Sequence, residues 1–315
     1  MPTVRHTRHE VLTSAPPERV FSLVADVTGW PQVFGSTVHA EVTEERDGEQ
    51  LLRVWAFVNG EAGSWSSRRV LDRAAGTIGF RLVKTPPPLA SLDGEWCVEP
   101  DDGGAHVVLL RHYSVADDEP GAAERVARAV DHDGEAELAA LRGSAEIAEQ
   151  WPELTFSFGD SEEISGSARD VYGFLDRADA WPERLPHVVA ARCTGEHGGV
   201  QVLDLETRSP DGSVQHSRSA RVSFPERGLL VYKRLTMPSL LAGHTGRWTV
   251  EQRGDGDTVT ATSWHTVTLD PAGVRQVLGE GASPAEARSL VRHALGTNST
   301  TTLRYAKEYA EARRS

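Results

Sequence analysis

The chain has 315 residues, enough for two domains of about 150 residues that each bury a core and leave room for an internal site. Its formal net charge of −13, without any Lys/Arg run, disfavours nucleic-acid binding. It has no apolar stretch of about 18 residues and no signal-peptide core at its start, so we expect a cytoplasmic protein that does not enter a membrane.

The first half begins with a predicted strand over residues 3–14 and a short helix after Pro16-Pro17. The apolar residues of this helix follow the i, i+3, i+4, i+7 spacing of one helix face, as Val20, Leu23, Val24 and Val27. Trp30-Pro31 is predicted to end the helical segment, because proline biases the residue before it away from helix.

Six strand-like runs follow, over residues 38–46, 50–58, 64–73, 77–85, 91–99 and 105–115. Asp47-Gly48 and Asn59-Gly60 between them are hairpin signals, so we expect an antiparallel meander. A long helix from about 121 to 149 closes this half, with an apolar stripe and Gly134 in its seam.

The second half repeats this order, with predicted strands over 155–165, 187–197, 199–208, 214–224, 228–236, 242–252 and 258–269. Its last helix begins after Ser283-Pro284 and has an apolar stripe formed by Leu290, Ala294, Leu303 and Tyr305. Sequence pairs also return about 150 residues later: Trp30-Pro31, for example, returns as Trp181-Pro182. We therefore predict two copies of one domain, residues 1–152 and 153–315.

Each copy is predicted to be an α+β domain: one strand, two short helices, six further antiparallel strands and a long C-terminal helix. These elements suit a curved seven-stranded sheet wrapped around the long helix. Such a sheet cannot pack tightly against one helix along its full length, so we expect a cavity between them.

The candidate chemistry lies on one predicted strand. Trp65, Ser67 and Arg69 occupy alternate positions and point to the same face, although alternation alone leaves open whether that face is buried or exposed. The second copy keeps Ser219 and Arg221 and has Ser217 in place of the tryptophan. Retention of Ser-x-Arg without the tryptophan suggests a separate task for the polar pair.

Four tryptophans recur between the copies, Trp30 with Trp181 and Trp96 with Trp248. They suit either the core or the flat apolar walls of a pocket for a planar ligand. Asn298 interrupts the stripe of the last helix, where it either faces the cavity and binds a ligand oxygen or is exposed.

Other chemistry has weaker support. Strand alternation could bring His216 or His265 toward the second cavity, where an imidazole could move a proton. The histidines lack metal-site spacing, and Cys97 and Cys193 occupy positions that do not correspond, so we expect no metal, no disulfide and two buried small residues. Without a nucleotide-binding glycine motif or a Gly-x-Ser-x-Gly elbow, we expect neither nucleotide-dependent nor serine-hydrolase chemistry, and we expect no cofactor.

Three segments together resemble the polyketide aromatase/cyclases of bacterial type II polyketide synthases. They are residues 14–21 leading to Trp30-Pro31, the strand segment 65–69, and Gly94-Glu95-Trp96. The doubled arrangement is similar to the didomain subgroup, and the resemblance spans essentially the whole chain. It implies two tandem helix-grip domains of the START-like superfamily, each with a cavity for a poly-β-ketone tethered to an acyl carrier protein.

The resemblance implies that Arg69 is catalytic, with Ser67 and Trp65 beside it, and it matches Arg221 and Ser219 in part. The tryptophans and Asn298 would then bind substrate. The implied reaction is aldol closure of the first ring, between C7 and C12 of a chain reduced at C9, and loss of water to an aromatic ring. The implied partners are the acyl carrier protein and other subunits of the synthase.

A non-catalytic START-like carrier of a lipid, a quinone or a polyketide remains the alternative prediction. An interaction scaffold is a third, which could apply to either half alongside catalysis. Ser-x-Arg favours the enzyme, because a carrier has little reason to bury a guanidinium in both copies.

Overall fold

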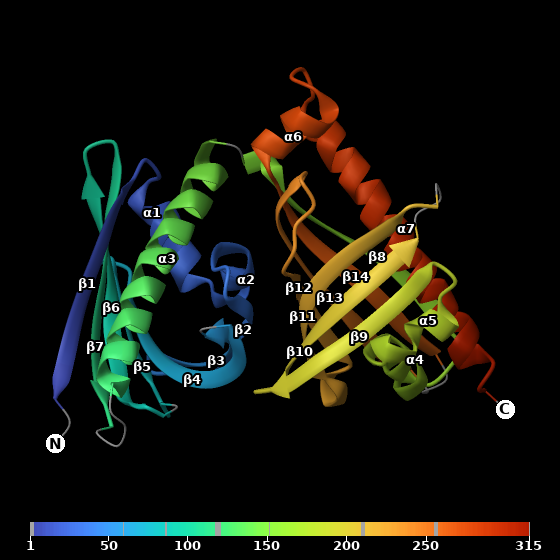
Figure 1. Cartoon of the computed structure of the whole chain (residues 1–315), viewed down its shortest axis with the longest axis horizontal. Coiled ribbons are helices and arrows are strands. Elements are labelled where there is room, and N and C mark those ends of the chain that lie inside the picture. The colour runs from blue at the N-terminus through green and yellow to red at the C-terminus, as the bar shows by residue number, and fades with distance from the viewer. Residues whose placement is uncertain are drawn as a thin grey trace. The chain divides into compact units, whose positions relative to one another are not determined.

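The computed structural model describes residues 3–58, 60–85, 87–116, 121–150, 152–208, 212–254 and 258–314. Contacts divide the chain into two compact units, Met1–Pro152 and Glu153–Ser315. Each unit contains one seven-stranded antiparallel sheet and one long helix, the predicted helix-grip architecture (Figure 1). Asn59 of the predicted Asn59-Gly60 turn lies outside the described residues.

The first unit contains seven strands in the sheet order β1-β7-β6-β5-β4-β3-β2. The strands are β1 Val4–Thr13, β2 Thr37–Arg46, β3 Glu49–Val58, β4 Glu61–Asp72, β5 Thr77–Leu82, β6 Leu89–Asp101 and β7 Gly104–Val115. The helices are α1 Pro17–Ala25, η1 Val27–Gly29, α2 Trp30–Val33 and the long α3 Ala122–Gln150.

The second unit repeats this topology in the order β8-β14-β13-β12-β11-β10-β9. Its strands are β8 Thr155–Ile164, β9 Val188–His197, β10 Val200–Arg208, β11 Val214–Phe224, β12 Leu229–Arg234, β13 Leu241–Arg253 and β14 Thr258–Leu269. Its helices are η2 Pro152–Leu154, α4 Ala168–Asp176, η3 Ala178–Ala180, α5 Trp181–Arg184, η4 Pro225–Arg227, α6 Pro271–Leu278 and α7 Pro284–Glu311.

Each long helix packs against the two strands at one edge of its sheet. α3 contacts β1, β7 and α1, while α7 contacts β8, β14 and α4. The short helices extend the cover to other strands, where α2 contacts β2 and α1 contacts β5 and β6 as well as β7. The two kinds of helix therefore cover adjacent parts of the sheet that overlap at β7.

Two details of the helices differ from the predictions. Trp30-Pro31 begins α2 instead of ending a helix, because proline is tolerated in the first turn, where its missing N–H has no partner to lose. The helix α6 was not predicted. It begins after Asp270, whose side chain accepts a hydrogen bond from the Ala272 amide, with Pro271 in its first turn.

The predicted stripe of α7 is confirmed at Leu303 and Tyr305, which pack in the core of the second unit, and is wrong in the first half of the helix. Leu290 and Ala294 are exposed, as is Asn298 four residues further on, because i, i+4 steps stay on one helix face. The face that packs against the sheet is made mostly of small residues: Ala287, Val291, Gly296, Ser299, Thr302, Leu303, Ala306 and Ala310. The start of the helix is as predicted, with Ser283 and Glu286 forming a capping box.

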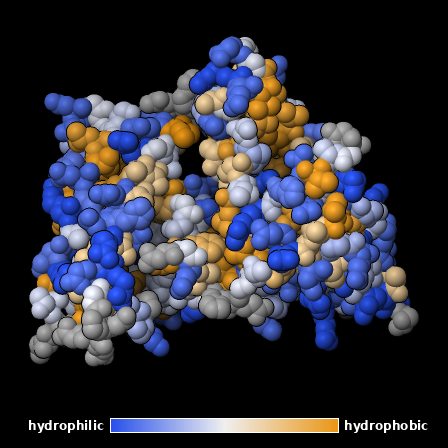
Figure 2. Space-filling view, viewed as in Figure 1, coloured by the Kyte–Doolittle hydropathy of each residue, from blue (hydrophilic) through white to orange (hydrophobic). Residues whose placement is uncertain are grey.

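The cores are apolar and the visible surface of each unit is mostly polar, with separate apolar patches (Figure 2). Trp96 lies in the first core and Trp248 in the second. Cys97 and Cys193 are free thiols that are only half-buried, so the prediction that both are buried was wrong. Across the described ranges, every helix is too short or too polar to cross a bilayer.

Candidate active site

The face of β4 that carries Ser67 and Arg69 is buried. Ser67 is 7% exposed and Arg69 is 3% exposed, whereas Val70 on the opposite face is 51% exposed. Trp65, on the same face, is partly buried and packs against a cluster that contains Leu52 and Val54. Strand alternation alone did not decide whether this face of β4 is buried or exposed, and the structure shows that it is buried.

Arg69 joins the sheet to the end of α1. Its Nη1 donates to the Val24 carbonyl at 3.0 Å, and its Nη2 donates to the Ala25 carbonyl. Its Nε donates to the Gln50 side chain on β3 at 2.9 Å. The cation thus lies at the negative end of the helix dipole. Burial lowers the pKa of Arg69 to about 10, which leaves it protonated at neutral pH.

The neighbours of Arg69 are aromatic and hydroxylic. Its Cζ atom lies 5.8 Å from the centroid of the Trp30 ring, within the range of a cation–π contact. The Trp30 indole donates to the Val24 carbonyl at 3.0 Å, so the ring is fixed to the same helix end. The Ser67 hydroxyl donates to the Arg81 carbonyl at 3.0 Å, which leaves its lone pairs as acceptors.

Arg221 has the same position in the second unit. Its Nη2 donates to the carbonyls of Leu175 and Asp176 at the end of α4, at 3.3 and 3.0 Å, and its Cζ lies 5.9 Å from the Trp181 ring centroid. It is 2% exposed, and burial lowers its pKa. Unlike Arg69, it has two buried nitrogens, Nε and Nη1, without a hydrogen-bond partner among the described residues.

A cavity of about 160 Å³ lies in the second unit beside Arg221. Its wall comes from α4, α5 and the strands β10 to β13. The lining residues are Leu175, Trp181, Leu203, Leu205, Ser217, Ser219, Arg221, Leu230, Tyr232, Arg234, His244 and Trp248. The structure thus brings together the predicted residues Arg221, Ser219, Trp181 and Trp248.

Asn298 does not belong to this wall. It lies on the exposed face of α7, and in the described part of the chain no residue of that helix lines the cavity. Its predicted role in substrate binding was therefore wrong, because the helix turns Ser299 toward the sheet and Asn298 away from it.

The structure adds polar residues that the sequence did not single out. Tyr232 and His244 line the cavity, and both contact His265, which is buried behind them. Of the two histidines considered for the second cavity, His265 therefore lies next to it, whereas His216 is exposed beside Glu206. Tyr232 and His244 were missed although the repeat carries a signal: the matching residues of the first copy, Phe80 and Leu92, are apolar.

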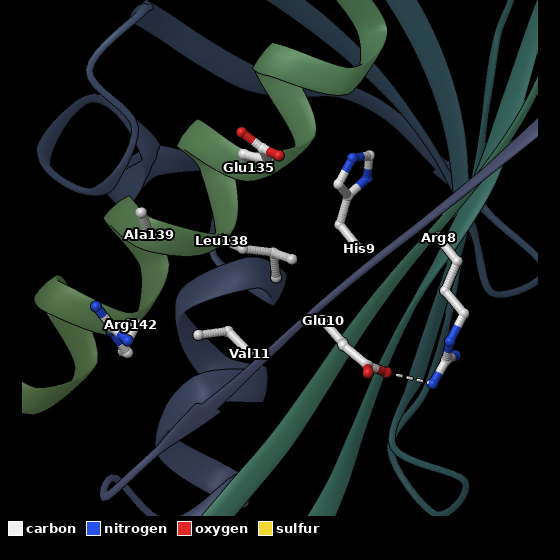
Figure 3. Close-up of a pocket in the computed structure, with 8 residues that line it drawn as sticks. All are labelled: Arg8, His9, Glu10, Val11, Glu135, Leu138, Ala139 and Arg142. Atoms are coloured by element: carbon white, nitrogen blue, oxygen red, sulfur yellow. Dashed lines mark hydrogen bonds and ion pairs between the residues drawn. The ribbon is translucent and has the colours of Figure 1, made fainter.

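A larger groove of about 360 Å³ lies elsewhere, between β1 and α3 of the first unit. Figure 3 shows its lining side chains, among them Arg8 and Glu10, which pair with each other. None of the predicted site residues lines this groove. Within the described ranges, no group of three or more His, Cys, Asp or Glu side chains is placed to hold a metal ion.

The chain is similar to known proteins along its whole length. Residues 3–146 match the family described as polyketide cyclase/dehydrase and lipid transport. The granaticin polyketide synthase bifunctional cyclase/dehydratase of Streptomyces violaceoruber is 42% identical, covering 98% of this chain and 95% of that protein. The corresponding actinorhodin protein of Streptomyces coelicolor is also 42% identical, covering 95% of this chain and 94% of that protein.

A solved structure agrees with this similarity. The crystal structure of the di-domain ARO/CYC BexL, from the BE-7585A biosynthetic pathway, has 45% identity and a TM-score of 0.89, covering 98% of this chain and 99% of that one. Sequence identity, fold and duplication all lead to the same conclusion: the chain belongs to the didomain polyketide aromatase/cyclases and is a polyketide cyclase/dehydratase.

Proposed function

We propose that the protein binds a poly-β-ketone chain tethered to an acyl carrier protein, closes its first ring by regiospecific aldol addition and removes water to form an aromatic ring. The ring joins C7 to C12 of a chain already reduced at C9. Relatives named as parts of the granaticin and actinorhodin polyketide synthases support the substrate class, and with it the carrier protein and other synthase subunits as partners.

One observation carries the proposal: each unit buries an arginine beside a tryptophan and a serine on the concave side of its sheet. Aldol addition creates an enolate and then an alkoxide, so its catalyst must stabilise negative charge on oxygen where water is scarce. A buried guanidinium that stays protonated does this. Arg221 supports the same chemistry, because two of its nitrogens would gain partners from a ligand oxygen.

The proposed roles follow from these positions. Arg69 and Arg221 hold substrate oxygens, while Ser67 and Ser219 exchange a proton with the substrate directly or through a water. The tryptophans, Trp30, Trp65 and Trp96 in the first unit and Trp181 and Trp248 in the second, bound the folded chain. On this proposal residues 1–152 and 153–315 are each an aromatase/cyclase domain, and the shape of each cavity selects the ring that forms.

A carrier of an apolar lipid would fit these contacts less well. An apolar cargo offers no partner to the unpaired nitrogens of Arg221, and each buried polar group left without a partner costs about 1–3 kcal/mol. A ligand with keto oxygens removes that cost, so this observation favours a polyketide over an apolar lipid, and the product spectrum separates catalysis from transport.

The test is reconstitution of the full-length protein with a synthase that delivers the carrier-bound chain. We expect the protein to change the product spectrum from spontaneously cyclised compounds to one aromatic product with a single first-ring pattern. We also expect the double variant Arg69→Lys/Arg221→Lys to stay folded and to give the spectrum of spontaneous cyclisation. An unchanged spectrum with the parent protein supports the carrier instead.

A further inference from the structure

The second unit has a polar cluster at four positions, three of which are apolar in the first unit. Tyr232 pairs with Gly246 across β12 and β13, as Phe80 pairs with Gly94 in the first unit. Both glycines are required, because a Cβ at either position would collide with the facing aromatic ring. The two rings therefore occupy equivalent places, and the hydroxyl is the difference between them.

The same registers identify the other members of the cluster. His244 corresponds to Leu92, two residues before the paired glycine of each unit. Ser263 faces Trp248 as Leu109 faces Trp96, and His265 faces Gly246 as Arg111 faces Gly94. In the first unit, Arg111 instead pairs with Glu137 of α3 at 2.6 Å.

The cluster is centred on the imidazole of His265. Its Nδ1 lies 3.0 Å from the Tyr232 hydroxyl and 3.0 Å from Nε2 of His244, and its Nε2 lies 3.1 Å from the Ser263 hydroxyl. His244 and His265 are each 5% exposed. Nδ1 of His244 is buried and lacks a hydrogen-bond partner within the part of the chain that the structure describes.

One nitrogen cannot serve both neighbours at once. A neutral ring nitrogen carries either one proton or one lone pair in the ring plane. Nδ1 of His265 can thus satisfy either Tyr232 or His244, and the other is available for a ligand. Because both line the cavity, a bound hydroxyl or carbonyl oxygen can complete the network.

The groups are neutral at physiological pH. Burial lowers the pKa of His244 to about 3 and that of His265 to about 4, and burial raises the pKa of Tyr232. The charged groups that act on the two histidines are Arg234 on β12, and Asp160 on β8 with Arg292 on α7. Asp160 and Arg292 pair with each other at 2.6 Å, so their opposite effects on the pKa of His265 largely cancel.

We propose that Tyr232 and His244 form a proton-transfer pair, bridged by His265, that removes water from a β-hydroxy ketone held in the cavity of the second unit by Arg221. This inference rests on the proposed function and deepens it. It assigns the dehydration step to the second unit and adds catalytic residues that have no counterpart in the first.

The step balances without an additional reactant. Nδ1 of His244 accepts the proton from the carbon next to the ketone, the C–H electrons form the new C=C bond, and Arg221 stabilises the developing enolate oxygen. The C–O bond at the β carbon breaks, and the departing hydroxide takes the Tyr232 proton and leaves as water. As Nδ1 of His244 gains its proton, the proton on Nε2 of His244 passes to Nδ1 of His265, so the weakly basic His244 does not persist as a cation, and from there the proton moves to the tyrosinate. His244 returns to its first tautomer by exchange with water.

The first unit supplies variants that preserve shape. Tyr232→Phe and His244→Leu each place in the second unit the residue that the first unit already uses at that position. His216→Leu is the matched control, since His216 is an exposed histidine of the same unit. The assay follows the full-length protein with the carrier-bound chain and separates the final aromatic product from the ring-closed product that still contains the water. Thermal unfolding checks that each variant is folded.

We expect Tyr232→Phe and His244→Leu to slow formation of the aromatic product about 100-fold, the contribution typical of a positioned proton donor or acceptor. The hydrated ring-closed product should accumulate, while ring closure continues. The rate with the parent protein should show no inflection near pH 6.5, where an unperturbed histidine titrates.

Each other outcome counts against a different claim. Aromatic product formed by folded Tyr232→Phe and His244→Leu at the parent rate overturns the proton-transfer pair and leaves the proposed function standing. Loss of ring closure together with dehydration means that the cluster serves the first step, which also overturns the inference. A parent protein that changes no product overturns the proposed function, and this inference falls with it.

Discussion

Replacement of Arg69 by lysine separates a catalytic cation from a structural one. The guanidinium donates to Gln50 and to two carbonyls at the end of α1. Lysine keeps the charge near the helix end but has one nitrogen, so it cannot maintain all three contacts in the same geometry. We expect it to lose the contact with Gln50, which lowers the free energy of unfolding by about 2 kcal/mol, the size of one hydrogen bond to a charged group.

A loss of this size leaves the protein folded, because domains are typically stable by about 5–15 kcal/mol. The effect on ring formation should be much larger than the unfolded fraction explains. Removing one positioned donor to a developing oxyanion slows catalysis by about 10²–10³-fold. We therefore expect Arg69→Lys to reduce the rate of first-ring formation at least about 100-fold, with a melting temperature only a few degrees lower.

The measurement is the rate of ring formation from the carrier-bound chain, together with thermal unfolding of the same samples. Arg68→Lys is the control, because Arg68 is the next residue on β4, lies on the opposite face and pairs with Glu49 near the surface. Equal rates for Arg69→Lys and the parent protein would refute the catalytic role of Arg69. So would an equal loss in Arg68→Lys.

Two further predictions concern the second unit. Ser217→Trp, which introduces the residue of the first copy at the cavity wall, should reduce binding of a fluorescent aromatic probe at least about 10-fold with little change in melting temperature; unaltered binding would place the ligand elsewhere. The pKa of His265 falls from 6.5 to about 4 on burial, and that of His244 to about 3, so only the unfolded chain gains these protons as the pH drops below 6.5. The free energy of unfolding, measured by urea titration, should therefore decrease from about pH 6.5 towards pH 4. The decrease should be smaller in His244→Leu, which lacks one of the two histidines. An equal decrease in the variant and the parent protein would contradict the burial of His244.

The sequence predicted the order of elements, apart from the helix α6, because its signals are local and occur twice. Hairpin turns, the strand alternation around Ser67 and the helix start at Ser283-Pro284 each depend on neighbouring residues. The face of β4 could not be decided in this way, since residues 65–69 are polar or aromatic on both faces. It is set by α1, which covers Arg69 and accepts its hydrogen bonds.

The errors have a common physical origin in long-range packing. The first half of the stripe of α7 was misplaced because the helix buries small and polar residues, such as Ser299 and Thr302, and exposes Leu290. Close packing on the sheet favours small side chains there, and hydropathy alone does not show it. The contacts of His265 were invisible for a similar reason, since they join β12, β13 and β14 and depend on strand register.

The bond between each arginine and the end of its first short helix bears on how the duplicated gene could diverge. Arg69 and Arg221 each hydrogen-bond the sheet of their own unit to the end of the short helix that covers it, so either unit would lose these contacts if the arginine were replaced. Selection for folding alone can therefore preserve both arginines, even in a unit that no longer catalyses one of the reactions. When the two halves of such proteins are compared, the residues around the arginine are better evidence of a specialised function than the arginine itself.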